Sequence, residues 1–452
     1  MFFGNRIFFL ILAILSLLFF FFSLFWAQDF WLLLLVFALA VLLAASWFWP
    51  RVSLIILIIL RTATDFLTGT EVFSLGGFSL NFTSLTGMVA IIFAFSVFFK
   101  EKLWRTKMPL ALAGGIFLVI ACFGLLHSFN QAASLIEILR WSSFAALFIL
   151  GFYLFKGSEK TTMLIKALIV SSIIPVVVAF VQFFNDWNFF DGERWRVNGT
   201  FVHPNMLAFY LLLAITLTIF LFLTLKKESI ERYFYLLFSL PLIGVLGLTY
   251  TRGAWLALFM ILFLIGIFHF RLFLGVSLFI VFIAYLLIIP FQSRINSLLA
   301  FSASDSTVWR LELWGDALDY GRDQIYFGAG PGTAPMTIAK HRPPTLGSTE
   351  PHNDYIKIIL ELGLLGLLAY LFLILSLLYN LWQGFRLESS PRWRLLFLFM
   401  LIFSFTLYAA SIGDNILKDS ALQWGFWVLI GVLMHRYLEL SKDSARLPEN
   451  RA

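Results

Sequence analysis

Apolar runs of about twenty residues recur along almost the whole chain, and they limit the possible folds more than any other feature of the sequence. An α-helix rises 1.5 Å per residue, so about 20 apolar residues cross the roughly 30 Å of hydrocarbon in a bilayer. Backbone groups inside hydrocarbon must be hydrogen-bonded within the protein, which helices achieve. The sequence therefore predicts an all-α fold, a polytopic transmembrane bundle of about 12 to 14 helices.

The apolar runs predict about fourteen helices, of which the third and tenth are short for a span. The first run is too long for a signal-peptide core and lacks a small-residue cleavage site, so we expect it to be retained. The predicted ranges are 7–26, 30–49, 51–64, 84–99, 108–126, 136–155, 162–184, 204–225, 233–250, 253–268, 271–290, 354–379, 394–412 and 421–438.

Composition supports the bilayer as the solvent, because 61% of the residues are hydrophobic and only 13% are charged. The net charge of +7 would suggest nucleic acid in a soluble protein. Here the basic residues form short clusters between apolar runs, a pattern that reflects membrane topology and predicts no nucleic-acid partner. The single cysteine, Cys122, lies inside an apolar run, which excludes a disulfide framework and a CxxC metal site.

The distribution of charge predicts the orientation. If the N-terminus is cytoplasmic, most basic residues fall in inward connections and most acidic residues in outward ones, as the positive-inside rule expects. Both termini would then face the cytoplasm. Basic residues in outward segments oppose this trend and need another reason to be there; they are Arg196, Arg252, Arg310, Arg322 and Arg342.

Two outward connections are longer than turns. The first, 185–203, ends before Pro204, a residue suited to the first turn of a helix. The second, 291–351, is expected to be partly helical, because apolar residues at helical spacing predict a surface helix near 307–322. Its GAGPG segment (328–332) lacks the Lys-Ser/Thr and the strand-to-helix context of a phosphate-binding loop, so we predict a turn.

Arg252 stands in the segment LTYTRGAW (248–255), at an expected outer helix boundary. Two interpretations are open. Its side chain could extend to the lipid headgroups. Alternatively it binds an anion, because a guanidinium forms bidentate hydrogen bonds to phosphate and stays charged when partly desolvated, which suits a pyrophosphate at the membrane interface.

His352 opens a later predicted helix, directly after Pro351. An imidazole has a pKa near neutrality and is the usual general base for a hydroxyl, although a lone histidine is more often structural. The following Asn353 or Asp354 could serve only as an N-cap. His203, before Pro204, fits equally a contact at the start of its helix or a sugar ligand. No HExxH, DxD or GxSxG pattern occurs, so no metal, other cofactor or serine nucleophile is expected.

Four segments together resemble the O-antigen ligase and O-antigen polymerase superfamily of bacterial membrane glycosyltransferases. The resemblance covers about 196–368, in the expected order, and the N-terminal third shares only its hydropathy. The segments are RVNGTFVHPNMLAFY (196–210), TYTRGAWLAL (249–258), WRLELWGDAL to FGAGPG (309–332) and PHNDYIKIILELGLLGLL (351–368).

The resemblance implies a GT-C-type fold in the bacterial cytoplasmic membrane, with a metal-independent, inverting active site on the extracytoplasmic side. The donor would be a glycan on undecaprenyl pyrophosphate. Outward arginines of the family bind the pyrophosphate and a histidine activates the acceptor; these roles map onto Arg196, Arg252 and His352. Arg194 lies close to Arg196 and is the alternative residue for its role. The predicted substrate-binding residues are Arg194, His203, Asn205, Asn353, Tyr355 and Arg310.

This interpretation divides the chain into N-terminal transmembrane helices (1–184), a catalytic membrane domain (185–438) that includes the loop 291–351, and a cytoplasmic tail (439–452). The acceptor stays open between lipid A core, another polysaccharide repeat unit and a protein hydroxyl, with the ligase favoured. A competing class is a lipid-glycan flippase or transporter, which predicts ionisable residues deep within helices. The nearest candidates are Arg140, Lys166 and Lys357.

Overall fold

The structure is a computed structural model that describes residues 30–446, except 76–77, 191–194, 272, 276–277, 280–305 and 343–347. Its helices are α2 (Phe30–Ser46), α3 (Pro50–Ala63), α4 (Phe82–Lys100), α5 (Ala111–His127), α6 (Gln131–Leu154), α7 (Ser158–Val170), α8 (Ile173–Phe184), α9 (Pro204–Thr224), α10 (Ile230–Leu248), α11 (Arg252–Phe268), α14 (Ser306–Tyr320), α15 (Ala334–His341), α16 (Asp354–Leu387), α17 (Pro391–Ala410) and α18 (Ser420–Arg446). Short 3₁₀ turns are η2 (Asp65–Gly69), η3 (Leu103–Arg105), η4 (Arg322–Gln324) and η6 (Ile416–Lys418). Two antiparallel hairpins pair β1 (Glu71–Leu75) with β2 (Phe78–Asn81) and β3 (Phe189–Phe190) with β4 (Trp195–Arg196).

Within the described part, seven helical segments are long and apolar enough to cross a membrane, with α7 and α8 together counted as one. Three shorter apolar helices, 34–46, 111–127 and 252–268, accompany them. The chain is therefore an all-helical, multi-pass membrane bundle, as its apolar runs predict. The two small hairpins were not predicted. The predicted helix 7–26 lies outside the described residues, and so does most of 271–290.

Two predicted spans are interrupted. The run 162–184 is divided after Val170, where Ser171 and Ser172 donate their hydroxyl protons to the carbonyls of Leu168 and Ile169. Such bonds offer the backbone an alternative to the helix. The segment α16 contains a break at Gly363, whose φ of 67° lies in the left-handed region that favours glycine.

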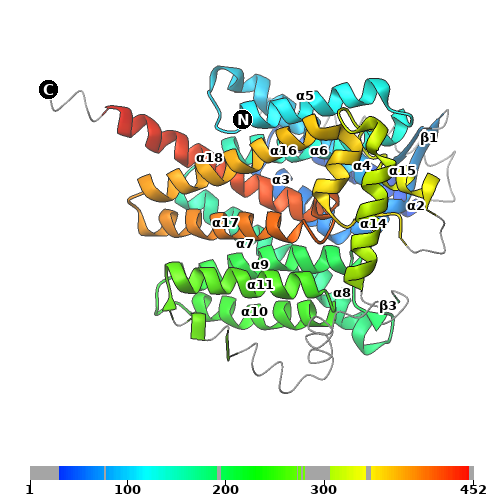
Figure 1. The fold of residues 1–452 in the computed structure, drawn as a ribbon. Helices are drawn as coiled ribbons and strands as arrows, with labels where there is room; N and C mark the ends of the chain where they lie inside the picture. The colour runs from blue at the N-terminus through cyan, green and yellow to red at the C-terminus, as the bar shows by residue number, and fades with distance from the viewer. Residues whose placement is uncertain are drawn as a thin grey trace.

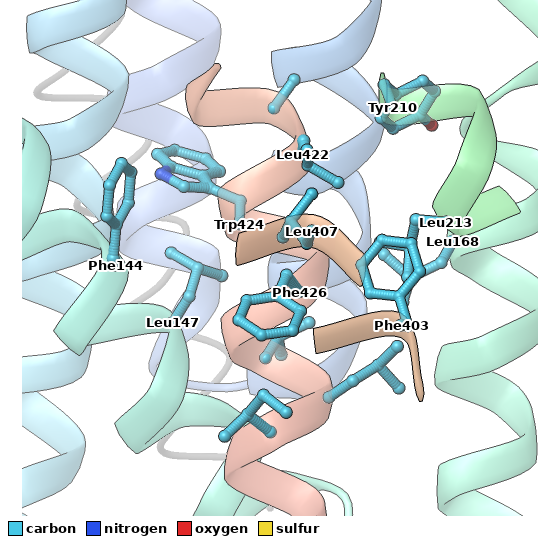
Figure 2. Close-up of a cluster of buried hydrophobic side chains, with 14 of the residues drawn as sticks. Phe144, Leu147, Leu168, Tyr210, Leu213, Phe403, Leu407, Leu422, Trp424 and Phe426 are labelled. Carbon is cyan, nitrogen blue, oxygen red and sulfur yellow. The ribbon is translucent and has the colours of Figure 1, made fainter. Parts of the chain in front are cut away.

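Helices α6 and α18 pack closely at the centre of the bundle. A Cβ on Gly151 would overlap the carbonyl of Val428, and one on Gly431 would overlap the carbonyl of Phe148, so each backbone lies against the other. Small residues permit this approach between membrane helices, where close packing replaces the hydrophobic driving force. Around this seam, Phe144, Trp424, Phe426, Phe403 and Leu213 form part of the core (Figure 2).

The hairpins, α14 and α15 all lie at one end of the bundle (Figure 1). Four helices that start at this end are capped there by a side chain that accepts from a backbone N–H. The caps are Asn81 for α4, Asn130 for α6, His203 for α9 and Asn353 for α16. Capping satisfies donors that the first helical turn leaves open. We call this the loop end.

A buried charge cluster lies near the loop end, between α6 and the first part of α16. Lys357 Nζ lies 2.7 Å from Glu137 Oε1 and 2.8 Å from Glu361 Oε2, and Arg140 also pairs with Glu137. Two positive and two negative side chains thus neutralise one another. This pairing removes the main penalty of burying charge.

The GAGPG segment docks on the same part of α16. Gly328, Gly330 and Gly332 have φ of 72°, 107° and 73°, and the N–H groups of Ala329 and Gly330 donate to the carbonyls of Leu360 and Glu361 at 2.8 and 3.0 Å. The predicted turn is confirmed. Its backbone donors satisfy α16 carbonyls exposed by the break at Gly363, so this turn fixes the first part of α16.

We expect Lys357→Met to destabilise the protein by about 3–5 kcal/mol, because it leaves two buried carboxylates without their shared cation. The matched control is Lys166→Met. Lys166 pairs with Glu231 at 2.5 Å, but both side chains are about 40% exposed, and such pairs contribute about 0–1 kcal/mol. Thermal unfolding of the purified proteins in detergent measures both. Equal shifts for the two variants would contradict the assigned role of the cluster.

Candidate functional site

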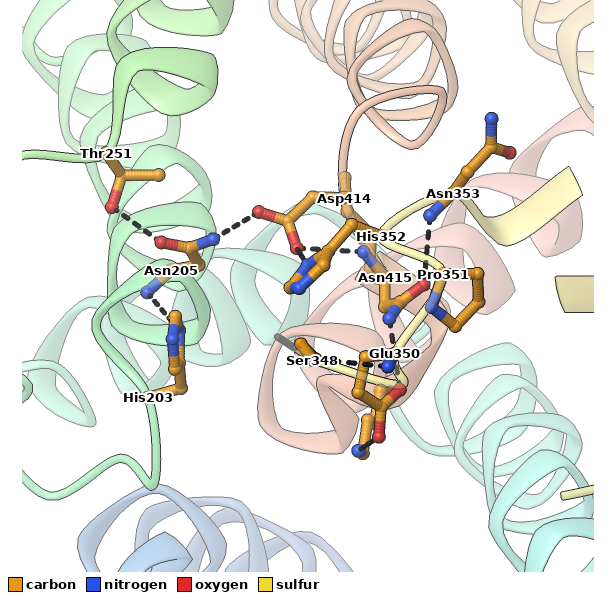
Figure 3. Close-up of polar contacts among 12 residues, drawn as sticks. His203, Asn205, Thr251, Ser348, Glu350, Pro351, His352, Asn353, Asp414 and Asn415 are labelled. Carbon is orange, nitrogen blue, oxygen red and sulfur yellow. Dashed lines mark hydrogen bonds and ion pairs between the residues drawn. The ribbon is translucent and has the colours of Figure 1, made fainter. Parts of the chain in front are cut away.

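The candidate site is formed at the loop end by four segments that are distant in sequence: the start of α9, the turn between α10 and α11, the start of α16, and the connection between α17 and α18. Figure 3 shows Thr251, Asn205, Asp414 and His352, one from each segment, with their side chains directed toward one another. Predicted residues from two of the family-like segments therefore lie in one network, and a third segment contributes Thr251, which was not predicted.

The start of α16 is bound to the α17–α18 connection. Asn353 donates its N–H to Asn415 Oδ1 at 3.1 Å, while its own Oδ1 accepts from the N–H groups of Tyr355 and Ile356. Asp354 Oδ2 accepts from the N–H groups of Ile416 and Leu417. These bonds hold the backbone on the C-terminal side of His352, which has a left-handed φ of 48°. Such a conformation persists where its surroundings determine it.

His352 faces the carboxylate of Asp414. Its Nδ1 lies 3.6 Å from Asp414 Oδ1, and its side chain is 21% exposed, so the ring has a carboxylate on one side and access to the surroundings. This distance is longer than a hydrogen bond and describes an ion pair when the ring is protonated. Trp309 of α14 approaches the imidazole edge-on, with ring centroids 6.2 Å apart.

The pKa of Asp414 is lowered from its ordinary value of 3.8. Burial raises this pKa, but the contact with His352, the charge of Arg310 and the backbone N–H of Asn415 together lower it by a larger amount. The carboxylate is therefore ionised at neutral pH. This fixed negative charge lies beside the imidazole of His352.

Asn205 joins Asp414 to Arg196. Its Nδ2 donates to Asp414 Oδ2 at 2.5 Å, and its Oδ1 accepts from Arg196 Nη2 at 2.6 Å. Arg196 also donates from Nε to the carbonyl of Thr249 at 2.6 Å and from Nη2 to Thr251 Oγ1 at 2.9 Å. We use the term polar network for these four linked side chains: Arg196, Asn205, Asp414 and His352.

Arg252 is the first residue of α11 and follows Thr251, which donates to Asn205 Oδ1 at 3.3 Å. Its side chain is half-buried. Arg310 reaches the α17–α18 connection from α14, with Nη1 3.9 Å from where a Cβ on Gly413 would stand. Both predicted arginines thus belong to segments that adjoin the polar network.

Other predicted residues have structural contacts. His203 Nδ1 accepts from the N–H of Asn205 at 3.1 Å, the helix-start contact that was one of its two interpretations. Asn353 is 5% exposed and acts as the N-cap. Tyr355 directs its hydroxyl into the bundle and donates to the carbonyl of Tyr408 at 2.8 Å. Arg194 lies outside the described residues.

Sequence reasoning missed Asp414 as a partner of His352. The connection SIGDNILKD (411–419) is a short polar stretch between two apolar runs, which is the only signal it offers. Glu350 was also missed: it pairs with Lys418 and accepts from Asn415 Nδ2 at 3.2 Å. In the described part of the chain, no three His, Cys, Asp or Glu side chains are grouped to hold a metal ion.

Residues 237–371 match a family model described as O-Antigen ligase. The match includes Arg252, Arg310 and His352, and it bears out the resemblance seen in the motifs. Arg196 and Asn205 precede it, and Asp414 follows it. A comparison with curated proteins finds no match.

A second acidic residue of the α17–α18 connection provides a contrast with Asp414. Asp419 is 3% exposed, and its Oδ1 accepts from the N–H of Leu422 at 3.1 Å. Burial, with the nearby charge of Asp65, raises the pKa of Asp419 well above 3.8 despite that hydrogen bond and the charge of Arg61. The contributions of these two carboxylates to the stability of the fold therefore change in opposite directions as pH rises.

We expect Asp414→Asn and Asp419→Asn to change the unfolding temperature with opposite pH dependence. A lowered folded-state pKa contributes stability above the unfolded pKa of 3.8, and this is lost as pH falls through the folded pKa. Asp414→Asn should therefore destabilise most at neutral pH. A raised pKa contributes stability at acid pH that is lost as pH rises through the folded pKa, so Asp419→Asn should be neutral or stabilising near pH 7 and less favourable in acid. The same pH profile for both variants in detergent would contradict this assignment.

Proposed function

We propose that this chain, a membrane protein of the O-antigen ligase family, is a glycosyltransferase that moves a glycan from an undecaprenyl-pyrophosphate carrier to an acceptor hydroxyl. The reaction takes place on the extracytoplasmic side of the bacterial cytoplasmic membrane. The observation that carries the proposal is the partly exposed imidazole of His352 at the loop end, with Asp414 Oδ1 3.6 Å from its Nδ1.

His352 is the proposed general base. As the acceptor oxygen attacks the anomeric carbon, its proton passes to Nε2 of His352, the nitrogen that does not face Asp414. The bond between the anomeric carbon and the pyrophosphate oxygen breaks, and its electron pair leaves with the lipid pyrophosphate. This single displacement inverts the anomeric configuration. The ionised Asp414 stabilises the imidazolium that forms, as a carboxylate does for a catalytic histidine.

The leaving pyrophosphate gains negative charge, and preorganised cations lower the energy of such a transition state. We assign this role to Arg252 and Arg310, which come from segments adjoining the polar network. Arg196 donates to three protein oxygens, on Thr249, Asn205 and Thr251. We therefore assign Arg196 a structural role: it holds Asn205 and Thr251 of the polar network in place. The proposed reaction is metal-independent.

The arrangement of charge supports an extracytoplasmic loop end. Basic residues gather where helices begin or end away from it, in the α4–α5, α6–α7, α9–α10 and α16–α17 connections. By the positive-inside rule that opposite end is cytoplasmic. These residues are Lys100, Lys102, Arg105, Lys107, Lys156, Lys160, Lys226, Lys227, Arg386, Arg392 and Arg394.

The acceptor distinguishes three activities that would share this site. A ligase transfers the glycan to lipid A core, a polymerase to another repeat unit, and a protein O-oligosaccharyltransferase to a protein hydroxyl. We favour the ligase, because the PHNDY and TRGAW segments resemble that branch. The family model that matches residues 237–371 is also described as O-Antigen ligase.

The competing transporter hypothesis depends on ionisable residues within the helices. Arg140 and Lys357 belong to the neutral charge cluster, and Lys166 pairs with Glu231. Each of the three candidate residues therefore has an acidic partner that accounts for its presence. This favours a structural role for them over a transport pathway.

We expect His352→Ala to lower kcat by at least about 10²-fold, the usual contribution of a general base. The assay uses purified protein in liposomes, a lipid-linked glycan donor and a defined acceptor, and a chelator should not change the wild-type rate. The control is His341→Ala, which removes an exposed histidine stacked on Tyr320 and should leave the rate unchanged. Normal transfer by His352→Ala would eliminate the proposed base.

We expect Arg252→Ala to weaken donor use by about 1.5–3 kcal/mol, the range for hydrogen bonds to charged groups. Arg252→Lys should recover only part of this loss, because an ammonium lacks the bidentate geometry. Both effects appear in kcat/KM for the donor. The control is Arg322→Ala, at the exposed start of η4. If Arg252→Ala and Arg322→Ala behave alike, Arg252 does not bind the pyrophosphate.

A further inference from the structure

An arginine–aspartate pair is buried where α3 ends, outside the four family-like segments. Arg61 and Asp65 are 2% and 3% exposed, and Arg61 Nη2 lies 2.6 Å from Asp65 Oδ1. Arg61 follows a largely apolar stretch of α3, residues 52–60. Ionisable side chains within membrane helices are rare and costly, so each needs an identified partner and role. Asp65 is the partner of Arg61, and the role of the pair follows from its other contacts.

Stability alone does not explain such a pair. The desolvation of two buried charges offsets most of their mutual attraction, and apolar residues of similar volume often replace a buried ion pair without loss of stability. A buried pair does fix geometry, because each charge must keep its hydrogen-bond partners. The segments that Arg61 and Asp65 bind are therefore the segments that the pair positions.

Asp65 binds the segment that leads into α9. Its Oδ2 accepts from the N–H of Val202 at 3.2 Å, three residues before Asn205. Two residues earlier in the chain, the hydroxyl of Thr200 donates to the carbonyl of Thr62 at 2.6 Å. The end of α3 thus holds this segment by two hydrogen bonds. Asn205 is the residue through which α9 enters the polar network.

Arg61 binds the start of α18. Its Nη2 donates to Ser420 Oγ at 2.5 Å, and Ser420 is the first residue of that helix. Asp414 lies six residues before Ser420, in the α17–α18 connection. The same Nη2 contacts Asp65, so one guanidinium group links the α9 side of the polar network to its α18 side. The hydrogen bond from Asn205 to Asp414 spans these two sides.

We propose that Arg61 and Asp65 are positioning residues of the candidate site, which set the separation of Asn205 from Asp414. They act through the polar network on the orientation of His352. The inference rests on the proposed function and gives the N-terminal helices a part in it. A displacement of about 1 Å at a reacting group can lower a rate by about 10²-fold, so small shifts of these segments affect transfer measurably.

The test replaces the pair by apolar residues, Arg61→Met with Asp65→Leu, so that neither partner is left as an unpaired charge. We expect kcat for glycan transfer to fall by about tenfold while KM for the donor changes by less than about twofold, because the groups that bind the donor remain. In an Asn205→Ala background the same replacement should change kcat by less than about twofold, because the link through which the pair acts is already broken. Arg61→Lys alone keeps the charge and should lose less than the double replacement.

The matched control is an arginine–glutamate pair at the opposite end of the bundle. Glu388 is 3% exposed, and its Oε2 lies 2.6 Å from Arg436 Nε. Arg436→Met with Glu388→Leu should leave kcat within about twofold of the wild type, because it removes no contact of the polar network. Unfolding temperatures in detergent check that both double variants are folded. If the Arg61 and Asp65 replacement does not fold, Ser420→Ala, which removes the Arg61–Ser420 bond, gives the same comparison of backgrounds.

An equal loss of kcat with and without Asn205 would show a general effect on the fold and would overturn the inference, as would an unchanged kcat. The proposed function stands in either case. If wild-type protein transfers no glycan, the proposed function fails instead, and amide hydrogen exchange decides the inference. The Arg61 and Asp65 replacement should then speed exchange in both 198–206 and 411–419, and the control replacement in neither. Unchanged exchange in either segment overturns the inference.

Discussion

The largely buried carboxylate of Asp414, whose side chain is 14% exposed, is the group on which the candidate site depends. It accepts from Asn205 of α9 and faces His352 before α16, so one charge joins parts of the bundle that are distant in sequence. A buried carboxylate is costly unless cations and hydrogen-bond donors surround it. Asp414 therefore needs Asn205 and His352 beside it, and Arg196 in turn binds Asn205. The contacts that keep Asp414 ionised also hold these side chains in place.

The same principle organises the first part of α16. Lys357 between Glu137 and Glu361 fixes one side of this segment, and Asp354 bound to Ile416 and Leu417 fixes its start. The GAGPG turn occupies the carbonyls beside the break at Gly363. His352 thus precedes a short helical segment that is bonded on several sides, which suits a group that must be positioned for proton transfer.

Much of the fold follows from the sequence because membrane helices need only length, apolarity and end signals. Pro204 and Asn353 are residue types that favour the start of a helix, and α9 and α16 begin at or directly after them. The glycines of GAGPG likewise predict the turn that the structure contains. The break at Ser171 and Ser172 depends on local hydroxyl bonds that hydropathy does not report. The pairing of Asn205 with Asp414 spans 209 residues, so it depends on tertiary packing, and no local pattern predicts it.

The most direct test of this account is a double-mutant cycle on kcat between Asn205→Ala and Asp414→Asn, measured with reconstituted protein and a lipid-linked donor. If both residues act by holding His352 through one network, the second substitution adds little to the first, and the coupling energy exceeds about 1 kcal/mol. Effects that add to within about 0.5 kcal/mol would show two independent sites and would contradict the account.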